Sequence, residues 1–222
     1  MMKRLRILGV VLAFIGLGFL AGGGVAFAKI QDGYGSLQSF SEAQNVELSY
    51  NEDGQLIDRG STEEAEAIMQ LLKDDWGYPV VESDLDPDDP LVNSATEYMY
   101  QMATIAYHVL NGTHTVELEE AVEYEGETFE AGTYEVGVEG RYWTEFDRQH
   151  PLDGKVREMA WTGTVHGLVG ELGVGTVTHS ALQMGLGIAA LLGGLGATLV
   201  LTGLGFVWVS YGRRKEEDAV TA

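Results

Sequence analysis

The chain of 222 residues contains no cysteine. This absence excludes a disulfide framework, a thiolate metal site and a cysteine nucleophile. Basic residues are scarce too, since 13 Lys and Arg stand against 34 Asp and Glu, a net charge of −21. Binding to nucleic-acid phosphates needs a basic surface, so we expect no nucleic acid partner. Apolar residues nevertheless form 45% of the chain, and they are concentrated at its two ends.

Two stretches without a charged side chain predict two transmembrane helices, at residues 7–28 and 184–211. A helix of the first length is about 33 Å long and can cross a hydrocarbon core of about 30 Å. A cleaved signal peptide is the alternative for the first stretch, because a basic segment precedes it and Ala26 to Ala28 match a cleavage pattern. The stretch exceeds the usual apolar region of a signal peptide, which favours an uncleaved anchor.

Basic residues flank both stretches, in the N-terminal residues 1–6 and in the tail 212–222. Because such flanks remain in the cytoplasm, we expect both termini inside and residues 29–183 outside. The sequence therefore predicts a multi-pass protein of the plasma membrane. Its expected partners are the lipid bilayer and either other membrane proteins or further copies of itself.

The predicted outer segment carries most of the acidity, with 7 basic and 31 acidic residues and a net charge of −24. A solvated halophilic surface explains this balance, because in molar salt the repulsion between charges is screened within about 3 Å. Capture of cations from the medium is the alternative explanation.

Capping signals predict two helices in the first half of the outer segment, after a short strand at 46–50. The first helix covers residues 61–75 and begins with a capping box, a Ser followed three residues later by a Glu. The second begins at Pro90, with Asp89 as its N-cap, and ends at Asn111. The outer segment is therefore not all-β.

Apolar residues then alternate over 113–142, which predicts a small antiparallel β-meander. A glycine-rich helix follows at about 153–171, and Gly173 and Gly175 mark a break before the second span. A continuous helix into the membrane is the alternative. We therefore expect a membrane protein whose two transmembrane helices flank an extracytoplasmic α+β domain.

Small residues recur at every fourth position in both predicted spans. Such ladders let helices approach closely, because no side chain holds the backbones apart. We expect these residues to pack the two spans together, or to join two copies of the chain. The helix-packing candidates are Gly18, Gly22, Ala189, Gly193 and Ala197.

Three aspartates, Asp84, Asp86 and Asp88, have the spacing of the first ligands of a calcium loop. The rest of that loop does not follow, because Asp89 replaces the required glycine and Ala95 stands where a glutamate is needed. They are candidates for a weak surface Ca²⁺ or Mg²⁺ site, with helix capping as the alternative. No cofactor is expected.

The sequence contains no recognisable catalytic constellation. No two histidines have the spacing of a helical zinc pair, and no serine lies in a nucleophile elbow. His166 and His179 lie on the approach to the second span, where a histidine ring either binds a partner or a proton or is simply hydrated. Asn111 and Thr113 form an N-glycosylation sequon on the predicted outer side, with a helix C-cap as the alternative.

The segment FDRQHP, from Phe146 to Pro151, and the helix after it resemble a group of small two-span prokaryotic membrane proteins of unknown function. Some members of that group are labelled aromatic ring-opening dioxygenase, LigA subunit. That chemistry uses non-haem iron held by two histidines and a carboxylate, and no such triad is recognisable in this sequence. The resemblance implies two spans around an outer domain, and it transfers no site residue.

These features favour a non-enzymatic envelope or accessory protein that acts through its outer domain and its glycine-rich spans. An outer module that binds a ligand or a cation is the first alternative, and it requires a pocket with convergent polar groups. A membrane-bound hydrolase is the second alternative, and it requires a nucleophile next to a base.

Overall fold

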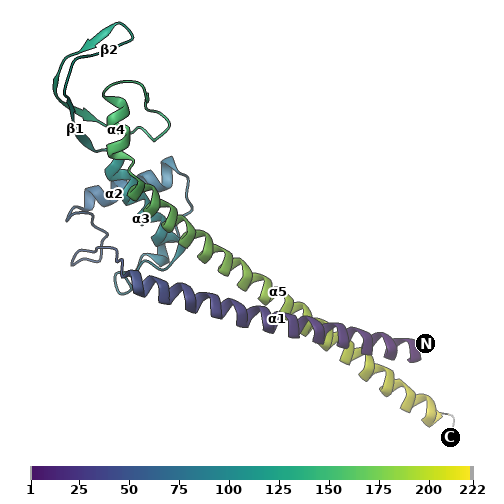
Figure 1. Cartoon of the computed structure of the whole chain (residues 1–222). Helices are drawn as coiled ribbons and strands as arrows, with labels where there is room; N and C mark the ends of the chain where they lie inside the picture. The colour runs from purple at the N-terminus through teal and green to yellow at the C-terminus, as the bar shows by residue number, and fades with distance from the viewer. Residues whose placement is uncertain (1, 221–222) are drawn as a thin grey trace. The chain divides into compact units, whose positions relative to one another are not determined.

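The structure is a computed structural model that describes residues 2–220, with side chains for residues 2–211. It separates into two compact units. The helical unit comprises Met1–Ser39 and His179–Ala222, and the α+β unit comprises Phe40–Thr178 (Figure 1). The α+β unit is shorter at both ends than the outer segment 29–183 expected from charge and hydropathy.

The helical unit consists of parts of two long helices, α1 (Met2–Gln44) and α5 (Gly163–Val220). Both are long and apolar enough to cross a membrane, and the most apolar 18-residue segment of each is only 11% buried. The two helices run in opposite directions, so the N- and C-terminal ends of the chain lie at the same end of this unit (Figure 1). The two predicted apolar spans are therefore present as an antiparallel helix pair.

A seam of mostly small residues with a period of seven joins α1 and α5. Within the helical unit, the described part of each helix buries residues at this spacing and no others. A seven-residue period keeps the buried positions on one face when the helices coil slightly around each other. The buried positions are Gly9, Gly16, Gly23, Ile30 and Leu37 on α1, and Ala189, Gly196, Gly203 and Ser210 on α5.

The glycines of this seam bring the two backbones into direct contact. A Cβ atom placed on Gly9 would lie 2.5 Å from the carbonyl oxygen of Gly203. One placed on Gly16 would lie 2.7 Å from the carbonyl oxygen of Gly196. No side chain larger than hydrogen fits at these two crossings, so the helices are joined by close backbone packing and dispersion.

The helix-packing residues predicted from the sequence lie mostly outside this seam. Gly18, Gly22 and Gly193 have open space where a Cβ would be, and Ala197 is exposed. Ala189 is the member of the set that the seam buries. The prediction of α1–α5 packing by steps of four is wrong for Gly18, Gly22 and Ala197, because steps of seven are what stay on the shared face. The backbone of Gly193 does lie against α1, since its nitrogen would be 3.2 Å from a Cβ placed on Gly23. Packing of those residues between copies stays a prediction.

Helix α3 (Ala95–Leu110) is the centre of the α+β unit, and none of its residues is exposed. A complete capping box starts it: the Ser94 hydroxyl accepts the Glu97 N–H, and the Glu97 carboxylate accepts the Ser94 N–H. Its end before Asn111, which serves as the C-cap, confirms the predicted boundary.

The start predicted for this helix, at Pro90 with Asp89 as its cap, is wrong. Pro90 and Val92 instead form backbone hydrogen bonds with residues 46–48, at 2.8 and 2.9 Å. These bonds use the alternating segment predicted as a strand, which forms isolated bridges. The capping box at Ser94, four residues after Pro90, provides the stronger start signal because it satisfies two backbone N–H groups.

Helix α2 (Thr62–Gln70) begins at the predicted cap, with the Ser61 hydroxyl accepting the Glu64 N–H at 3.2 Å. The reciprocal bond of a capping box does not form, because the Ser61 N–H donates to the carbonyl of Asp58. The helix then widens into a π-helix, η1 (Leu71–Asp75), which ends where the sequence predicted.

The strands form a nested hairpin. β1 (Thr113–Leu118) pairs with β4 (Gly132–Gly137), and between them β2 (Val122–Tyr124) pairs with β3 (Glu127–Phe129); both pairs are antiparallel. The predicted meander is therefore wrong in its order, because in a meander each strand pairs with the next. The turn Glu125–Gly126 closes the inner pair, with both residues at positive φ as tight hairpins require.

The predicted helix at 153–171 is two helices. α4 (Asp153–Ala160) ends before Trp161, and α5 starts at Gly163 and continues without a break into the helical unit. The predicted break at Gly173 and Gly175 is wrong, because both lie inside α5. Gly175 faces the ring of Tyr98, and a Cβ there would lie 2.7 Å from a ring carbon. This glycine lets α5 lie directly against α3.

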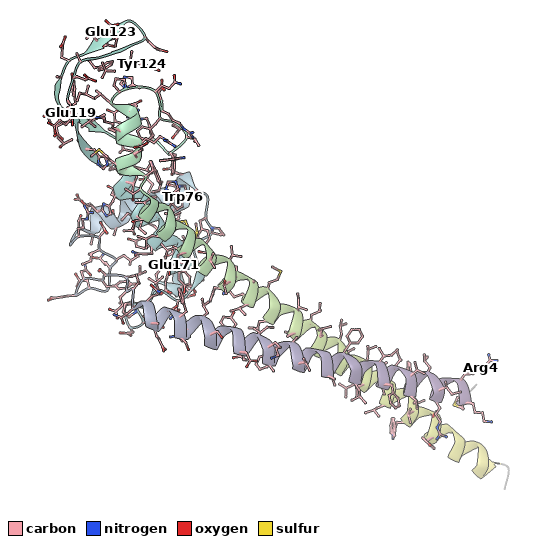
Figure 2. All side chains as sticks on the ribbon, in the orientation of Figure 1. Arg4, Trp76, Glu119, Glu123, Tyr124 and Glu171 are labelled. Carbon is pink, nitrogen blue, oxygen red and sulfur yellow. The ribbon has the colours of Figure 1, made fainter. Side chains whose placement is uncertain are left out.

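The two units differ in the chemistry of their side chains. On the apolar stretches of α1 and α5 almost every side-chain atom is carbon, whereas oxygen atoms cover residues 40–178, Glu119 and Glu123 among them (Figure 2). Those residues include 30 acidic and 6 basic ones, a net charge of −24. The α+β unit keeps its large apolar side chains inside, as Ile68, Leu72 and Val138 show.

Candidate functional site

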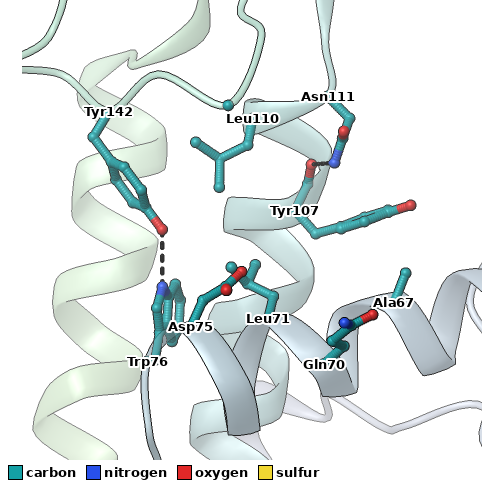
Figure 3. Close-up of a pocket in the computed structure, with 10 residues that line it drawn as sticks. Ala67, Gln70, Leu71, Asp75, Trp76, Tyr107, Leu110, Asn111 and Tyr142 are labelled. Carbon is teal, nitrogen blue, oxygen red and sulfur yellow. Dashed lines mark hydrogen bonds between the residues drawn. The ribbon is translucent and has the colours of Figure 1, made fainter.

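A cavity with a volume of about 680 Å³ lies within the α+β unit. It opens between the C-terminal ends of η1 and α3 and the loop that follows β4 (Figure 3). Its lining residues are Ala67, Gln70, Leu71, Asp75, Trp76, Tyr107, Leu110, Asn111, Gly140 and Tyr142. Three of them are aromatic, two carry side-chain amides, one carries a carboxylate, and none is basic.

The π-helix η1 positions one side of this cavity. The Trp76 N–H donates to the Leu71 carbonyl at 3.0 Å, five residues back, where an α-helix would use the fourth. The wider turn places Leu71, Asp75 and Trp76 along the cavity. Single π-turns are unusual and occur often at functional sites, which singles out this end of the helix.

Aromatic side chains form a continuous wall from the cavity into the core. The Trp76 indole N–H donates to the Tyr142 hydroxyl at 2.8 Å (Figure 3). Tyr142 stacks on Trp161, with ring centroids 5.7 Å apart and planes 25° apart. The indole N–H of Trp161 in turn donates to the carbonyl of Arg141. These contacts hold the Tyr142 ring in place, although 38% of the residue is exposed.

The electrostatic environment of the cavity is negative. Asp75 has neither a hydrogen bond nor an ion pair with any described residue, and its carboxylate points into the space beneath Leu110 (Figure 3). Two helices, α2–η1 and α3, direct their C-terminal ends at the cavity, and a helix C-terminus carries a partial negative charge. Arg141 is engaged elsewhere, because its guanidinium pairs with Asp153 at 2.9 Å.

Two smaller cavities have a different character. One, of about 370 Å³, lies beside β1 and is lined by Glu117, Glu119 and Glu120 with Lys155, which already donates to the Glu117 carbonyl. The other, of about 220 Å³, is mainly apolar and lies over the buried hydrogen bond between Ser41 and Tyr98. Ligand sites usually occupy about 300–1,000 Å³, so the apolar one is small for a ligand.

The aspartates proposed as cation ligands belong to a turn. Asp84 ends the short 3₁₀-helix η2 (Glu82–Asp84), and the Asp86 carboxylate accepts the backbone N–H of Asp88 at 2.9 Å. Asp86 and Asp89 also form a β-bridge. Among the described residues no group of three or more His, Asp or Glu side chains is arranged to hold a metal ion.

The predicted glycosylation site Asn111 is the C-cap of α3, and its side-chain amide donates to the Tyr107 carbonyl at 2.8 Å. The side chain is exposed, so this capping role leaves glycosylation a prediction. His166 lies edge-on to the rings of Trp143 and Trp161, and the His179 ring lies edge-on to Tyr34. Both histidines therefore have aromatic neighbours.

A buried polar cluster escaped the sequence reasoning. The hydroxyls of Tyr50 and Tyr100 are buried and have no hydrogen-bond partner among the described residues. Burial raises the pKa of Tyr50 to about 12 and raises the pKa of Tyr100 as well. Nearby, Asp58 Oδ2 lies 2.7 Å from His108 Nε2. Among the described residues, no serine, threonine or tyrosine hydroxyl forms a hydrogen bond with His108.

The FDRQHP segment is a structural turn that holds the inner hairpin. The Tyr124 hydroxyl donates to Asp147 at 2.5 Å, which raises the pKa of Tyr124 to about 12 and lowers that of Asp147. His150 Nδ1 accepts the N–H groups of Leu152 and Asp153, and so caps α4. Local turn chemistry and aromatic packing therefore explain why these residue types occur here.

Comparisons with known proteins give no relative: no family model, no curated protein and no solved structure matches the chain.

Proposed function

We propose that the protein is a non-enzymatic accessory protein of the plasma membrane, anchored by α1 and α5 as an antiparallel transmembrane pair. Residues 40–178 then form its extracytoplasmic part, and both termini are cytoplasmic. The positively charged flanks at residues 1–6 and 213–215 support this orientation, because such flanks stay inside.

The observation that carries the proposal is the distribution of residue size in the helix pair. Small residues occupy the seam, while large apolar side chains point away from it: Phe14 is 72% exposed, Leu201 70% and Trp208 78%. A water-soluble protein rarely exposes a continuous apolar surface of this kind. In lipid the same surface is favourable, and small residues at the contact are what helix association there requires.

The ends of the apolar stretches support the same proposal. The Arg6 guanidinium lies 4.6 Å from the centre of the Tyr211 ring. Trp208, about one helical turn before Tyr211 on α5, is exposed. Aromatic and basic side chains of this kind are typical of a membrane–water interface. At the other end of the α1 stretch, Lys29 and Asp32 form a largely exposed ion pair at 3.2 Å.

Labelling on intact cells tests the orientation, and the absence of native cysteine makes each variant carry a single thiol. We expect Ser36→Cys to react with a membrane-impermeant maleimide. Thr221→Cys, which lies outside the described residues, should react only after the cells are opened. If Thr221→Cys but not Ser36→Cys reacted on intact cells, the topology would be the reverse of the proposed one.

A second candidate function, an extracytoplasmic module that binds a small molecule, is favoured by the cavity at Trp76 and Tyr142. Its volume of about 680 Å³ lies in the range of ligand sites, and it combines aromatic walls with a few polar groups. In that case the helix pair serves to hold the binding unit at the membrane surface. A small molecule that binds the purified chain, and that binds a Trp76 variant more weakly, would support this candidate.

A further inference from the structure

We infer that the cavity at Trp76 and Tyr142 binds an organic cation whose head is a methylated or quaternary ammonium group. The inference rests on the second proposed function, since it names the ligand class of that module. Three features of the cavity carry it: its charge, its aromatic rings and its lack of metal ligands.

The charge of the site favours a cation. Asp75 contributes a carboxylate that no described side chain neutralises, and the C-terminal ends of η1 and α3 add partial negative charge from two directions. No basic residue lines the cavity. The net charge of −24 on residues 40–178 also raises the local concentration of cations around the opening.

The aromatic rings favour an organic cation over an inorganic one. Trp76, Tyr107 and Tyr142 line the cavity, and the faces of such rings attract ammonium groups. A methylated ammonium group is weakly hydrated, so it loses little by leaving water for such a site. Ca²⁺ sites usually gather several carboxylate and carbonyl oxygens, whereas a single carboxylate, that of Asp75, lines this cavity. The volume of about 680 Å³ is also far larger than a metal ion requires.

The hydrogen bond between Trp76 and Tyr142 gives the site its rigidity. Because the indole N–H is already bonded to the Tyr142 hydroxyl at 2.8 Å, and Tyr142 is stacked on Trp161, two rings are fixed before a ligand arrives. A preorganised pair of rings lowers the ordering cost of binding. The unpaired Asp75 carboxylate is then free to contact the cation.

The test compares two probes of nearly equal shape, choline and its uncharged analogue 3,3-dimethylbutan-1-ol, by calorimetric titration of the full chain in mild detergent at fixed salt. We expect choline to bind at least tenfold more tightly than the alcohol. Asp75→Asn should weaken choline binding at least tenfold. The matched control Asp74→Asn, which removes a neighbouring exposed carboxylate outside the cavity, should change it less than twofold.

Each result decides between distinct claims. Equal affinity for choline and the alcohol would overturn the cation inference while supporting a ligand-binding cavity. No binding of either probe would overturn the inference and leave the second proposed function to ligands of another class. Equal losses in Asp75→Asn and Asp74→Asn would mean that only the general negative field attracts the probe, and would overturn the assigned site. Because the comparison of the two probes needs no variant, it decides even if Asp75→Asn does not fold.

Discussion

The helical unit and the α+β unit reach stable packing by opposite distributions of side chains. In the helical unit glycine and alanine lie inside while Phe14 and Leu201 lie outside; in the α+β unit large aliphatic side chains lie inside and carboxylates outside. In water, burial of large apolar side chains drives folding. In lipid that drive is absent between helices, so the stability of a helix pair depends mainly on how closely the two backbones approach. This difference is what we expect if, as proposed, the helical unit lies in lipid and the α+β unit in water.

We expect the largest effect from enlarging a residue in the glycine seam. Gly203→Leu places a side chain against the backbone of Gly9 and Ala13, and its Cβ alone would lie 2.7 Å from the Ala13 nitrogen. Neither backbone relaxes easily, so we expect a loss of about 4 kcal/mol or more, above the usual 1–3 kcal/mol of overpacking. Thermal unfolding followed by circular dichroism in mild detergent measures it.

Gly193→Leu is the matched control, because it makes the same change ten residues earlier on the same helix, where a Cβ has no atom within 4 Å. It should leave the unfolding temperature within about 2 °C of the parent. If both variants were equally destabilised, the seven-residue seam would not be what joins the helices.

Large-to-small substitutions test which side chains are buried in each unit. Ile68 is fully buried in the α+β unit, so Ile68→Ala should cost about 3 kcal/mol through lost burial and the cavity left behind. Leu201→Ala removes a side chain that is 70% exposed in the helical unit, and it should cost almost nothing in detergent. Chemical denaturation with tryptophan fluorescence distinguishes them, and a larger effect at Leu201 would contradict the assignment of inside and outside.

Salt should affect the two units unequally. The net charge of −24 in the α+β unit is repulsive, and at 0.01 M salt the screening length grows to about 30 Å. We expect this unit to lose roughly 2 kcal/mol, about 5 °C in Tm, between molar and 0.01 M NaCl. Near-ultraviolet circular dichroism of the full chain reports it. A Tm that does not change between these conditions would remove the halophilic interpretation of the acidity.

The smallest expected effect concerns the capping box of α3. Burial raises the pKa of Glu97, although the N–H groups of Asn93 and Ser94 partly oppose that rise. A folded-state pKa above the unfolded value means that the folded form holds the proton more tightly, so this contribution is present at acid pH and lost as pH rises through the folded pKa. The free energy of unfolding of the parent minus that of Glu97→Gln should therefore be smaller at pH 7 than at pH 4.

Denaturation of the parent and of Glu97→Gln at both pH values measures this difference, which cancels the general charge effect of the other carboxylates. Ser94→Ala provides a reference for the cap itself and should cost about 1 kcal/mol at either pH. If the parent instead became more stable relative to Glu97→Gln as the pH rises to 7, the pKa of Glu97 would not be raised.

Local signals in the sequence predicted much of this structure. The two apolar stretches, the cap at Ser61 and the helix end at Asn111 all depend on residues close in the chain, and each was found there. The start of α3 was misplaced at Asp89–Pro90, a weaker local signal than the capping box at Ser94, and residues 90–92 instead pair with residues 46–48 in a long-range contact. Strand order failed for the same reason, since β1–β4 pairing is a long-range contact.

The candidate site was less accessible to prediction. Asp75 and Trp76 join Tyr142 only after a π-turn and a loop more than sixty residues away bring them together, and neither has a short sequence motif. The seam was missed for a different reason. Gly9, Gly16 and Gly23 are visible in the sequence at intervals of seven, but the predicted ladders have intervals of four, which suit a different crossing of helices.

The central claim, that the outward side chains of α1 and α5 face lipid, is tested most directly by water accessibility in native membranes. Phe14→Cys and Leu201→Cys should not react with a water-soluble maleimide in opened membrane vesicles, although both side chains are among the most exposed in the structure. Ser36→Cys should react readily in the same vesicles, and all three should react after denaturation in detergent. Reaction of Phe14→Cys and Leu201→Cys at the rate of Ser36→Cys would show that these faces meet water, and would contradict the claim.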